Sequence, residues 1–587
     1  MGTITLKPVT GLIIKSQNSY VPHNAHVFKY QPSTLPNRYD GQGGNAYRKE
    51  YDAVKLMTEN TATYTKKFRG GHAFDVMLGY SASMQTFETV DITADGIIDD
   101  NLKWHNLNAV GSKENYTITS SYSRIVRHSI FARANYNYKS RYYLTLTARY
   151  DGSSNFAANR KWGFFPSGAF KWNVSNEKFL KKVRWIDNLA LRLSYGKSGN
   201  DAIAAYRSLG VYSSSTSGAI FNGSQSVGFY PSRIANPDLT WETTAAYNVG
   251  VDFSVFKNRI NLTVDAYYSR TNDLLLTLQT IESTGFRTRY TNLGQTSNRG
   301  VELSLETRNI QRRKFGWTTE FTVSHNNQMV DDIGHEDYVA CLESSDYMMY
   351  GYKAGYPLNA LWGFQYEGVF KNAEEIERNK VTRSYVGETS SDDVHTMLGR
   401  AKYADVNHDG VLSKEDQIYL GSSDPLLFGG LQNTFNIYGF KVGLYFSYSI
   451  GGKIYNYTEL AMSGGRSTNQ YRYMLDAWHP VRNPESDLPR AGIGDKHVPS
   501  SLQVHDASYL RFKTATVSYR FDLSKKKKTG LRDITIGVTG DNLFLLSKYN
   551  GFDPDVSTSS DTSTLRRVDM GAYPRARSII FTLQLRY

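Results

Sequence analysis

A period-two alternation of apolar and polar side chains runs through most of this 587-residue chain. From 241 to 255 the odd positions are mostly apolar or aromatic and the even positions mostly polar, and after a turn at Lys257 and Asn258 the pattern resumes through 268. Because successive side chains of a strand point to opposite faces, each such segment predicts a strand with one apolar and one polar face. The same alternation recurs at 142–151, 301–306, 441–450 and 578–587. The chain is therefore expected to be all-β and built from antiparallel hairpins.

Alternation also occurs in soluble β-sandwiches, but two further features favour a membrane barrel. Aromatic residues bracket the apolar faces, as at Tyr142 and Tyr150 or at Trp241 and Phe253, which is how interfacial girdles are arranged. Brief turns alternate with long polar connections, the longest of which are 204–236, 335–425 and 457–507. We therefore expect an antiparallel transmembrane β-barrel of roughly 14 to 18 strands, each about 9–11 residues long. Residues 1–587 would all belong to this barrel region, with 335–425 and 457–507 as long extracellular-type loops.

The composition agrees with a barrel and excludes several other classes of protein. Aromatic residues make up 13% of the chain, and 43 of them are Tyr, whose apolar ring and polar tip suit membrane interfaces. No run of about 18 apolar residues occurs, so no transmembrane helix is expected. The one cysteine, Cys341, excludes an internal disulfide and a multi-cysteine metal site. The formal charge of +13 is not clustered, and its densest run, the lysines at 525–528, falls in an expected turn. We therefore expect no nucleic-acid partner.

The most specific local motif lies at 405–416, inside a long loop. Its positions 1, 3 and 5 are Asp or Asn, position 6 is Gly410, position 8 is Leu412 and position 12 is a carboxylate. This spacing wraps oxygen ligands around Ca²⁺, with Gly allowing the sharp turn and position 7 contributing its carbonyl. The candidate metal ligands are Asp405, Asn407, Asp409, Val411, Ser413 and Asp416. We expect a structural Ca²⁺ that braces the loop; the alternative is an Asx-rich surface turn without an ion.

No sequence motif for catalysis is present. The Gly-x-Ser-x-Gly, His-Glu-x-x-His and phosphate-binding patterns are missing, and the 12 His are scattered. The sequence therefore predicts no enzyme, no catalytic residue and no catalytic cofactor.

Two further groups of residues have alternative interpretations. Charged residues on the polar strand faces either line a substrate path or pair with each other and with a plug; they include Arg149, Asp151, Glu242, Asp252, Asp265, Glu302, Glu306 and Glu320. Aromatic residues of the long loops either contact sugar rings or a partner, or form the packed cores of those loops; they include Trp362, Tyr471 and Trp478. No substrate-binding residue is identified from these patterns.

Several segments, in order along nearly the whole chain, resemble the C-terminal barrel portion of SusC/RagA-family TonB-linked outer-membrane transporters. They are ARYDGSSNF at 148–156, WGFFPS at 162–167, Trp172, LSYGKSGN at 193–200, NPDLTWE at 236–242, NRGVE at 298–302, the 405–416 loop, DASYLRFK at 506–513, GDNLF at 540–544 and YNGFDP at 549–554. The resemblance implies a 22-stranded barrel in the cell outer membrane that holds an N-terminal plug. It also implies TonB-dependent import of glycans, oligosaccharides or peptides, with a SusD-like surface lipoprotein as a lid.

The chain departs from the family pattern at its N-terminal side. It shows no signal, no TonB box and no plug motif, so we expect a fragment of the family barrel with the plug absent. Such a sheet has unpaired edges and is expected neither to close nor to transport by itself. The last residue, Tyr587, ends an alternating strand in the way that outer-membrane assembly signals do. The alternatives are a passive porin or siderophore-type receptor and a surface adhesion or structural barrel; the transported substrate stays open.

Overall fold

The structure, a computed structural model, divides the chain into two compact units. It describes residues 1–38, 43–112, 115–221, 224–280, 282–286, 288–334, 339–344, 347–378, 382–383, 397–463, 469–490, 498–523, 530–556 and 567–587. Unit 1 comprises Met1–Trp172, Leu193–Ala246 and Thr271–Leu293, and unit 2 comprises Asn173–Arg192, Tyr247–Arg270 and Gly294–Tyr587. The predicted lysine-rich turn at 525–528 lies outside the described residues.

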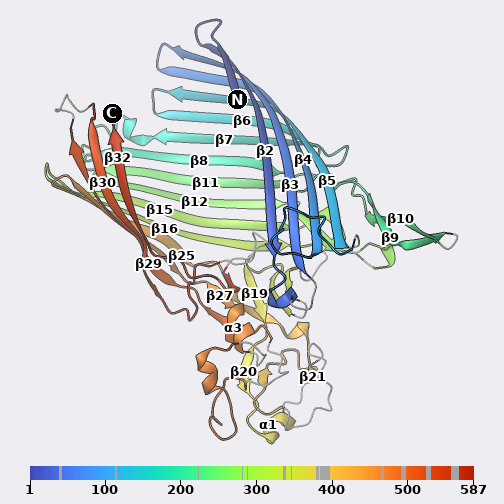
Figure 1. The fold of residues 1–587 in the computed structure, drawn as a ribbon. Coiled ribbons are helices and arrows are strands. Elements are labelled where there is room, and N and C mark those ends of the chain that lie inside the picture. The colour runs from blue at the N-terminus through green and yellow to red at the C-terminus, as the bar shows by residue number, and fades with distance from the viewer. Residues whose placement is uncertain are drawn as a thin grey trace. The chain divides into compact units, whose positions relative to one another are not determined.

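Unit 1 contains a run of seven antiparallel strands, each hydrogen-bonded to the next along the chain. The strands are β1 (Gly2–Leu6), β2 (Leu12–Gln31), β3 (Gly44–Phe68), β4 (His72–Ile97), β5 (Tyr116–Tyr138), β6 (Tyr142–Ser153) and β7 (Trp162–Asn173). Figure 1 shows β2 to β6 side by side. Short turns join β1 to β2, β3 to β4 and β5 to β6, and longer connections join the other neighbours. Lys139 and Ser140, between β5 and β6, have φ of +51° and +55°, the left-handed conformation that matches the twist of a hairpin.

Strands β2 to β5 are longer than the sequence predicted. They contain 20, 25, 26 and 23 residues, whereas β25 (Leu427–Ile437) and β26 (Phe440–Ile450) have the expected length of 11 residues. At about 3.3 Å per residue, β4 extends about 85 Å, well beyond a hydrocarbon layer of about 30 Å. The expected length of 9–11 residues was too short for most strands of the sheet, and most of all for these four, because ladder hydrogen bonding continues where the apolar alternation ends.

Unit 2 contains a second run of seven antiparallel strands. They are β15 (Gln295–Gln311), β16 (Phe315–Asp332), β25, β26, β29 (Tyr509–Asp522), β30 (Asp533–Ser547) and β32 (Ser578–Arg586). Three more strands have residues in both units: β8 (Ile186–Asn200), β11 (Glu242–Val255) and β12 (Ile260–Asn272). The described residues thus contain seventeen strands of this kind, a number within the predicted range.

The remaining elements are short. Unit 1 has the hairpins β9 (Val211–Phe221) with β10 (Ser224–Arg233) and β13 (Leu275–Gln279) with β14 (Thr288–Asn292), and the 3-10 turns Pro36–Arg38 and Glu282–Thr284. Unit 2 has β17 (Val339–Ser344), β18 (Tyr347–Tyr352), β19 (Ala360–Gly363), β20 (Tyr366–Val369), β21 (Thr382–Arg383), β22 (Ala401–Tyr403), β23 (Val411–Leu412), β24 (Ile418–Ser422), β27 (Lys453–Asn456), β28 (Val504–Asp506) and β31 (Val568–Asp569). Its helices are α1 (Ala373–Arg378) and α3 (Tyr457–Ser463), with 3-10 turns at Val174–Asn176, Lys414–Asp416, Arg472–Asp476 and Ser501–Gln503.

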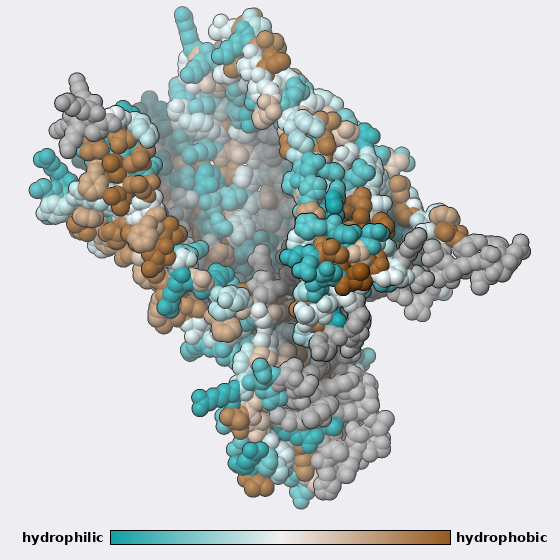
Figure 2. Space-filling model, viewed as in Figure 1, coloured by the Kyte–Doolittle hydropathy of each residue, from teal (hydrophilic) through white to brown (hydrophobic). Residues whose placement is uncertain are grey.

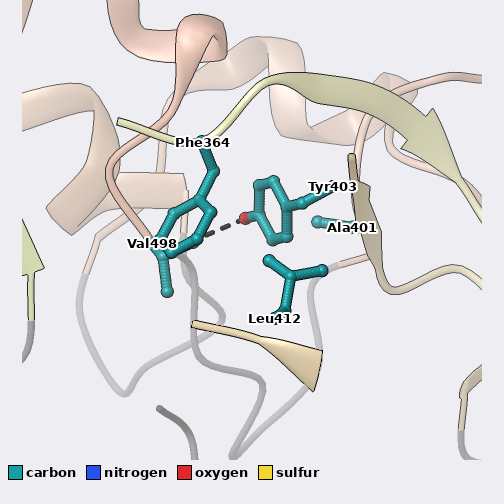
Figure 3. Packing of buried hydrophobic residues seen from close by; sticks show 5 residues of the cluster. All are labelled: Phe364, Ala401, Tyr403, Leu412 and Val498. Atoms are coloured by element: carbon teal, nitrogen blue, oxygen red, sulfur yellow. Dashed lines mark hydrogen bonds between the residues drawn. The ribbon is translucent and has the colours of Figure 1, made fainter. Parts of the chain in front are cut away.

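The short elements of unit 2 form a compact body from the long connections between its strands. The body holds β19, β20, β21, β27, α1 and α3, which lie together beyond the ends of β25 and β29 in Figure 1. Its core includes the buried residues Phe364, Ala401, Tyr403, Leu412 and Val498, shown in Figure 3. The loops predicted at 335–425 and 457–507 are therefore folded where they are described.

The strand runs keep the predicted difference between faces. In unit 2, Ile536 and Val538 of β30 pair with Leu583 and Phe581 of β32, and all four side chains are exposed. Figure 2 shows hydrophobic residues gathered over these strands. The alternate residues Thr535, Gly537 and Gln584 point to the other face. An apolar outer face is what a sheet in contact with lipid needs. No described helix is long and apolar enough to cross a membrane.

Candidate functional site

The predicted metal loop at 405–416 folds around its own backbone amides. The Asp416 carboxylate is fully buried and accepts hydrogen bonds from the N–H groups of Val406 at 2.9 Å and Ser413 at 2.7 Å. Asp405 Oδ2 accepts from Gly410 N–H at 2.9 Å, and Gly410 has the left-handed φ of +78° that the sharp turn needs. The six predicted ligands therefore share one tight loop.

The loop is anchored to the body by its apolar position. Leu412, at position 8, packs into the cluster with Phe364, Ala401, Tyr403 and Val498, and in Figure 3 these side chains converge on one another. The Tyr403 hydroxyl accepts a hydrogen bond from Val498 N–H at 3.5 Å. This packing fixes the second half of the loop against the body.

One carboxylate oxygen of the loop lacks a protein partner. Asp405 Oδ1 is buried and has no hydrogen bond to any described residue, which is where a cation would be accommodated. The carboxylate of Asp416 is already bonded to amides. Over the described part of the chain, no group of three or more His, Cys, Asp or Glu side chains is placed to hold a metal ion. The oxygens available in the loop therefore come from a mixed set of carboxylate, amide and backbone groups.

A larger candidate site lies in unit 2, where a cavity of about 690 Å³ opens on the polar face of the strands. Its lining residues are Tyr267, Asn298, Asn326, Gln328, Ser423, Asp424, Pro425, Phe428, Ser449, Tyr509, Asp555, Val556, Arg567 and Arg575. Strand register places those that lie in strands on one face: Asn298 pairs with Gln328, Phe428 with Ser449, and Ser449 with Tyr509. Amides, hydroxyls and charges from several strands thus converge on one hollow, as expected of a polar ligand site.

A cavity of about 630 Å³ in unit 1 has a different character. Tyr20, Leu56, Met84 and Val126 line it and pair in register across β2 to β5. These side chains belong to the apolar face, and few polar groups converge there. We therefore take the cavity of unit 2 as the candidate functional site.

A buried ion-pair network supports one wall of the unit 2 cavity. Arg511 donates to Asp553 Oδ1 at 2.6 Å and to Asn542 Oδ1 at 2.8 Å. Asp553 Oδ2 also lies 3.3 Å from Arg575 Nε, and Arg575 Nη2 lies 3.2 Å from Asp555 Oδ2. Because Arg575 and Asp555 line the cavity, the network fixes the position of two charged groups at its surface.

Arg567 is held differently. Its Nη1 donates to Gly451 O at 3.1 Å and its Nη2 to Ser449 Oγ at 2.6 Å, both neutral acceptors. Burial lowers the pKa of Arg567. The nearby Tyr509 and the carboxylates of Asp555 and Asp424 raise this pKa, but burial has the larger effect. The guanidinium stays charged, because an arginine pKa lies far above neutrality.

A cluster in unit 1 unites another set of sequence motifs. Phe156, Phe165, Leu239 and Trp241 form a buried cluster, and Trp241 Nε1 donates to Lys161 O at 2.9 Å. Trp241 was expected on the lipid-facing girdle and is instead 7% exposed. That expectation was wrong because Trp241 precedes the first residue of β11, so its side chain packs into the cluster.

The structure decides between the alternatives for charges and aromatics at several positions. Arg149 pairs with Asp151 at 3.1 Å, and Arg192 bridges Asp252 and Asp265 at 3.1 and 2.9 Å, so these charges pair with one another. Glu306 pairs with Arg308 at 3.3 Å. Among the loop aromatics, Trp362 and Trp478 are buried, which confirms that they form loop cores.

The sequence did not identify the residues of the unit 2 cavity. Three residues that support the cavity wall lie in three different motifs of the family resemblance: Arg511, Asn542 and Asp553. Their place in these motifs is the sequence signal that could have pointed to them. Arg567 lies in none of these motifs. Its place at the cavity follows from the fold alone.

Comparison with known proteins agrees with the fold along nearly the whole chain. The family model described as "TonB dependent receptor-like, beta-barrel" matches residues 10–543. The TonB-dependent receptor P26 of Formosa agariphila is 32% identical over 597 residues, covering 100% of this chain and 58% of that protein. The TonB-dependent receptor SusC of Bacteroides thetaiotaomicron is 27% identical over 574 residues, covering 95% of this chain and 52% of that protein.

A solved structure shows the same fold. A chain of the RagAB peptide transporter superposes with a TM-score of 0.82 at 22% sequence identity, covering 99% of this chain and 61% of that chain. The chain thus spans a little over half the length of the curated relatives it matches. The family, the antiparallel barrel fold and the SusC/RagA resemblance inferred from the sequence are confirmed, and the protein is placed in the outer membrane. The chain belongs to the family of TonB-dependent receptor-like β-barrels.

Proposed function

We propose that this chain forms the barrel wall of an outer-membrane nutrient importer that takes up glycans, oligosaccharides or peptides. The observation that carries the proposal is the family match over residues 10–543, together with a large polar cavity on the polar face of the unit 2 strands. Polar side chains from several strands suit a hydrated oligomer better than an apolar ligand. Uptake would be energised through TonB, and a SusD-like surface lipoprotein would act as the lid.

The similarity to SusC and to the RagAB peptide transporter supports an importer over the alternatives weighed from the sequence. A passive porin, a siderophore-type receptor and an adhesion barrel have no comparable support. The family is one of transporters, and we propose no catalytic activity for the chain.

Growth of the source bacterium tests the proposal. Deletion of the gene that encodes this chain is expected to abolish growth on one class of oligosaccharide or peptide, while growth on the corresponding monomers continues. A complemented strain serves as the control. Undiminished growth on every oligomer tested would contradict an importer role, and loss of surface attachment alone would favour the adhesion alternative.

We also propose that the loop at 405–416 binds a structural Ca²⁺. The buried, unpartnered Asp405 Oδ1 supports this proposal, and Asn407, Asp409, Val411, Ser413 and Asp416 would complete the oxygen set. Ca²⁺ is expected to raise the thermal unfolding temperature of the purified chain, and chelation with EGTA to reverse the rise. Asp405→Ala should remove the response, whereas Glu374→Ala, at an acidic position of α1, should keep it. An equal response in both variants would contradict the site.

A further inference from the structure

The charged groups that line the unit 2 cavity differ in how they are paired. Arg575 is engaged with Asp555 and Asp553. The Asp424 carboxylate accepts from Asn359 Nδ2 at 2.9 and 3.1 Å. The charged lining groups Arg575, Asp555 and Asp424 therefore already have protein partners. Arg567 is the remaining charged group of the lining.

Arg567 has spare hydrogen-bond donors beside an open cavity. Two of the five N–H donors of a guanidinium are used by Gly451 O and Ser449 Oγ, so three remain without an acceptor among the described residues. Within the described residues, no carboxylate lies at ion-pair distance from Arg567; Asp555, Asp424 and Asp506 act on its pKa from farther away. A partly desolvated guanidinium whose direct acceptors are neutral gains from an anionic ligand that reaches its remaining donors.

The backbone around Arg567 is shaped to hold the side chain in place. A Cβ atom at Gly452 would lie 2.3 Å from Arg567 Nη1, so the close approach of the guanidinium requires a glycine there. The Arg567 carbonyl accepts from Tyr455 N–H at 3.1 Å. The donor is thus preorganised at the cavity wall, which favours binding by limiting the loss of side-chain freedom.

Several other groups that line the cavity are neutral hydrogen-bonding groups. Asn298, Asn326 and Gln328 line the same cavity, and the buried Asn298 Oδ1 has no hydrogen-bond partner in the described part of the chain. Tyr267 donates to Asn326 Oδ1 at 2.9 Å. Amides of this kind bind hydroxyl or peptide groups, and they do not compete with Arg567 for an anion.

We propose that Arg567 anchors a carboxylate of the transported oligomer, so that the cavity selects acidic substrates over neutral ones. This rests on the proposed importer function and adds a substrate class to it. A guanidinium binds a carboxylate through two parallel hydrogen bonds. Such a carboxylate occurs both in uronic acid sugars and in acidic peptides, so the test needs a probe of each kind.

Calorimetric titration of the full 587-residue chain in detergent measures the preference. The sugar probe is tri-galacturonate, with its methyl ester as the neutral counterpart. The peptide probe is tri-glutamate with blocked termini, with blocked tri-glutamine as the counterpart. An acidic probe is expected to bind about tenfold or more tightly than its counterpart, and the preference is expected to shrink as salt is raised.

Three variants assign the preference to Arg567. Arg567→Gln is expected to remove it, and Arg567→Lys to keep part of it because the charge remains. Arg299→Gln removes the same charge beside Asn298 on the other face of β15, so it should leave the preference unchanged. Circular dichroism of each variant checks that the β-structure is retained.

The affinities of the acidic and neutral probes for the three variants decide whether Arg567 binds a carboxylate. An acidic preference that is lost in Arg567→Gln and kept in Arg299→Gln supports it, and the responding probe identifies the source of the carboxylate. Equal affinity for acidic and neutral probes, no binding of any probe, or a preference that survives Arg567→Gln overturns it. If the acidic preference fails in this way, gene-dependent growth on neutral oligomers would still support the importer function.

Discussion

Arg511 and Asp553 are 42 residues apart in the sequence and form a buried ion pair, with Arg511 Nη2 2.6 Å from Asp553 Oδ1. Their side chains are only 3% and 4% exposed. Asn542, from a third motif, accepts from Arg511 and donates to Arg575 O at 3.1 Å. Three separate motifs therefore meet at a point that supports the wall of the candidate site.

Removal of the Asp553 carboxylate is expected to destabilise unit 2 strongly. Asp553→Ala leaves Arg511 buried without its counter-charge, and breaking such a pair costs about 3–5 kcal/mol. Thermal unfolding of the purified chain, with denaturant titration, measures the change. Asp555→Ala is the matched control, because its carboxylate is 43% exposed and such a pair contributes about 0–1 kcal/mol. Similar losses in both variants would contradict the structural role of Asp553.

The substitution Gly199→Ala is expected to disrupt the buried cluster of unit 1 that contains Phe165 and Trp241. A Cβ atom there would lie 2.1 Å from Phe165 Cζ, and the buried Phe165 has little room to move. Overpacking of this kind costs about 1–3 kcal/mol. Gly443→Ala is the control, since nothing lies within 4 Å of its added Cβ atom. Equal unfolding temperatures of the two variants would show that the cluster around Trp241 is looser than described.

The strand pattern could be predicted from the sequence because it depends on local alternation. Pairs such as Val538 with Phe581 lie on the face that periodicity assigned to them. Trp241 could not be placed correctly, because its burial depends on contacts with Phe156 and Phe165 far away in the chain. Arg567 was missed for a similar reason: the cavity that it lines is assembled from six strands and the connections between them, and no local pattern records that convergence.

Substitution of Asp416 is expected to loosen the 405–416 loop. In Asp416→Asn one acceptor oxygen becomes a donor that faces backbone N–H groups, so the bonds to Val406 and Ser413 cannot both persist. A loss of about 1–3 kcal/mol corresponds to a fall of roughly fivefold to a hundredfold in amide protection. Hydrogen exchange of this loop measures the change. Glu374→Gln, at an exposed position of α1 outside the loop, should leave exchange unchanged.

Acid is expected to weaken the contact of α1 with β22. Burial raises the pKa of Glu375, but the Lys371 N–H and the ion pair with Lys402 at 2.7 Å outweigh this effect, so the pKa of Glu375 is lowered overall. A carboxyl group whose pKa is lower in the folded than in the unfolded state stabilises the fold at any pH above its unfolded-state pKa. That stabilisation is lost as the pH falls through the folded-state pKa. Proteolysis of 371–378 should therefore accelerate below about pH 4.5. In Glu375→Gln the acceleration should disappear; if it persists unchanged, another group is responsible.

The rate at which intact cells take up labelled oligomers tests the importer function most directly. Cells with the gene are expected to take up the oligomer on which the deletion strain fails to grow, and a protonophore that collapses the inner-membrane gradient should stop this uptake. Cells without the gene should show no uptake of that oligomer. Uptake that continues at full rate in the deletion strain would contradict the account, as would gene-dependent uptake that the protonophore leaves unchanged.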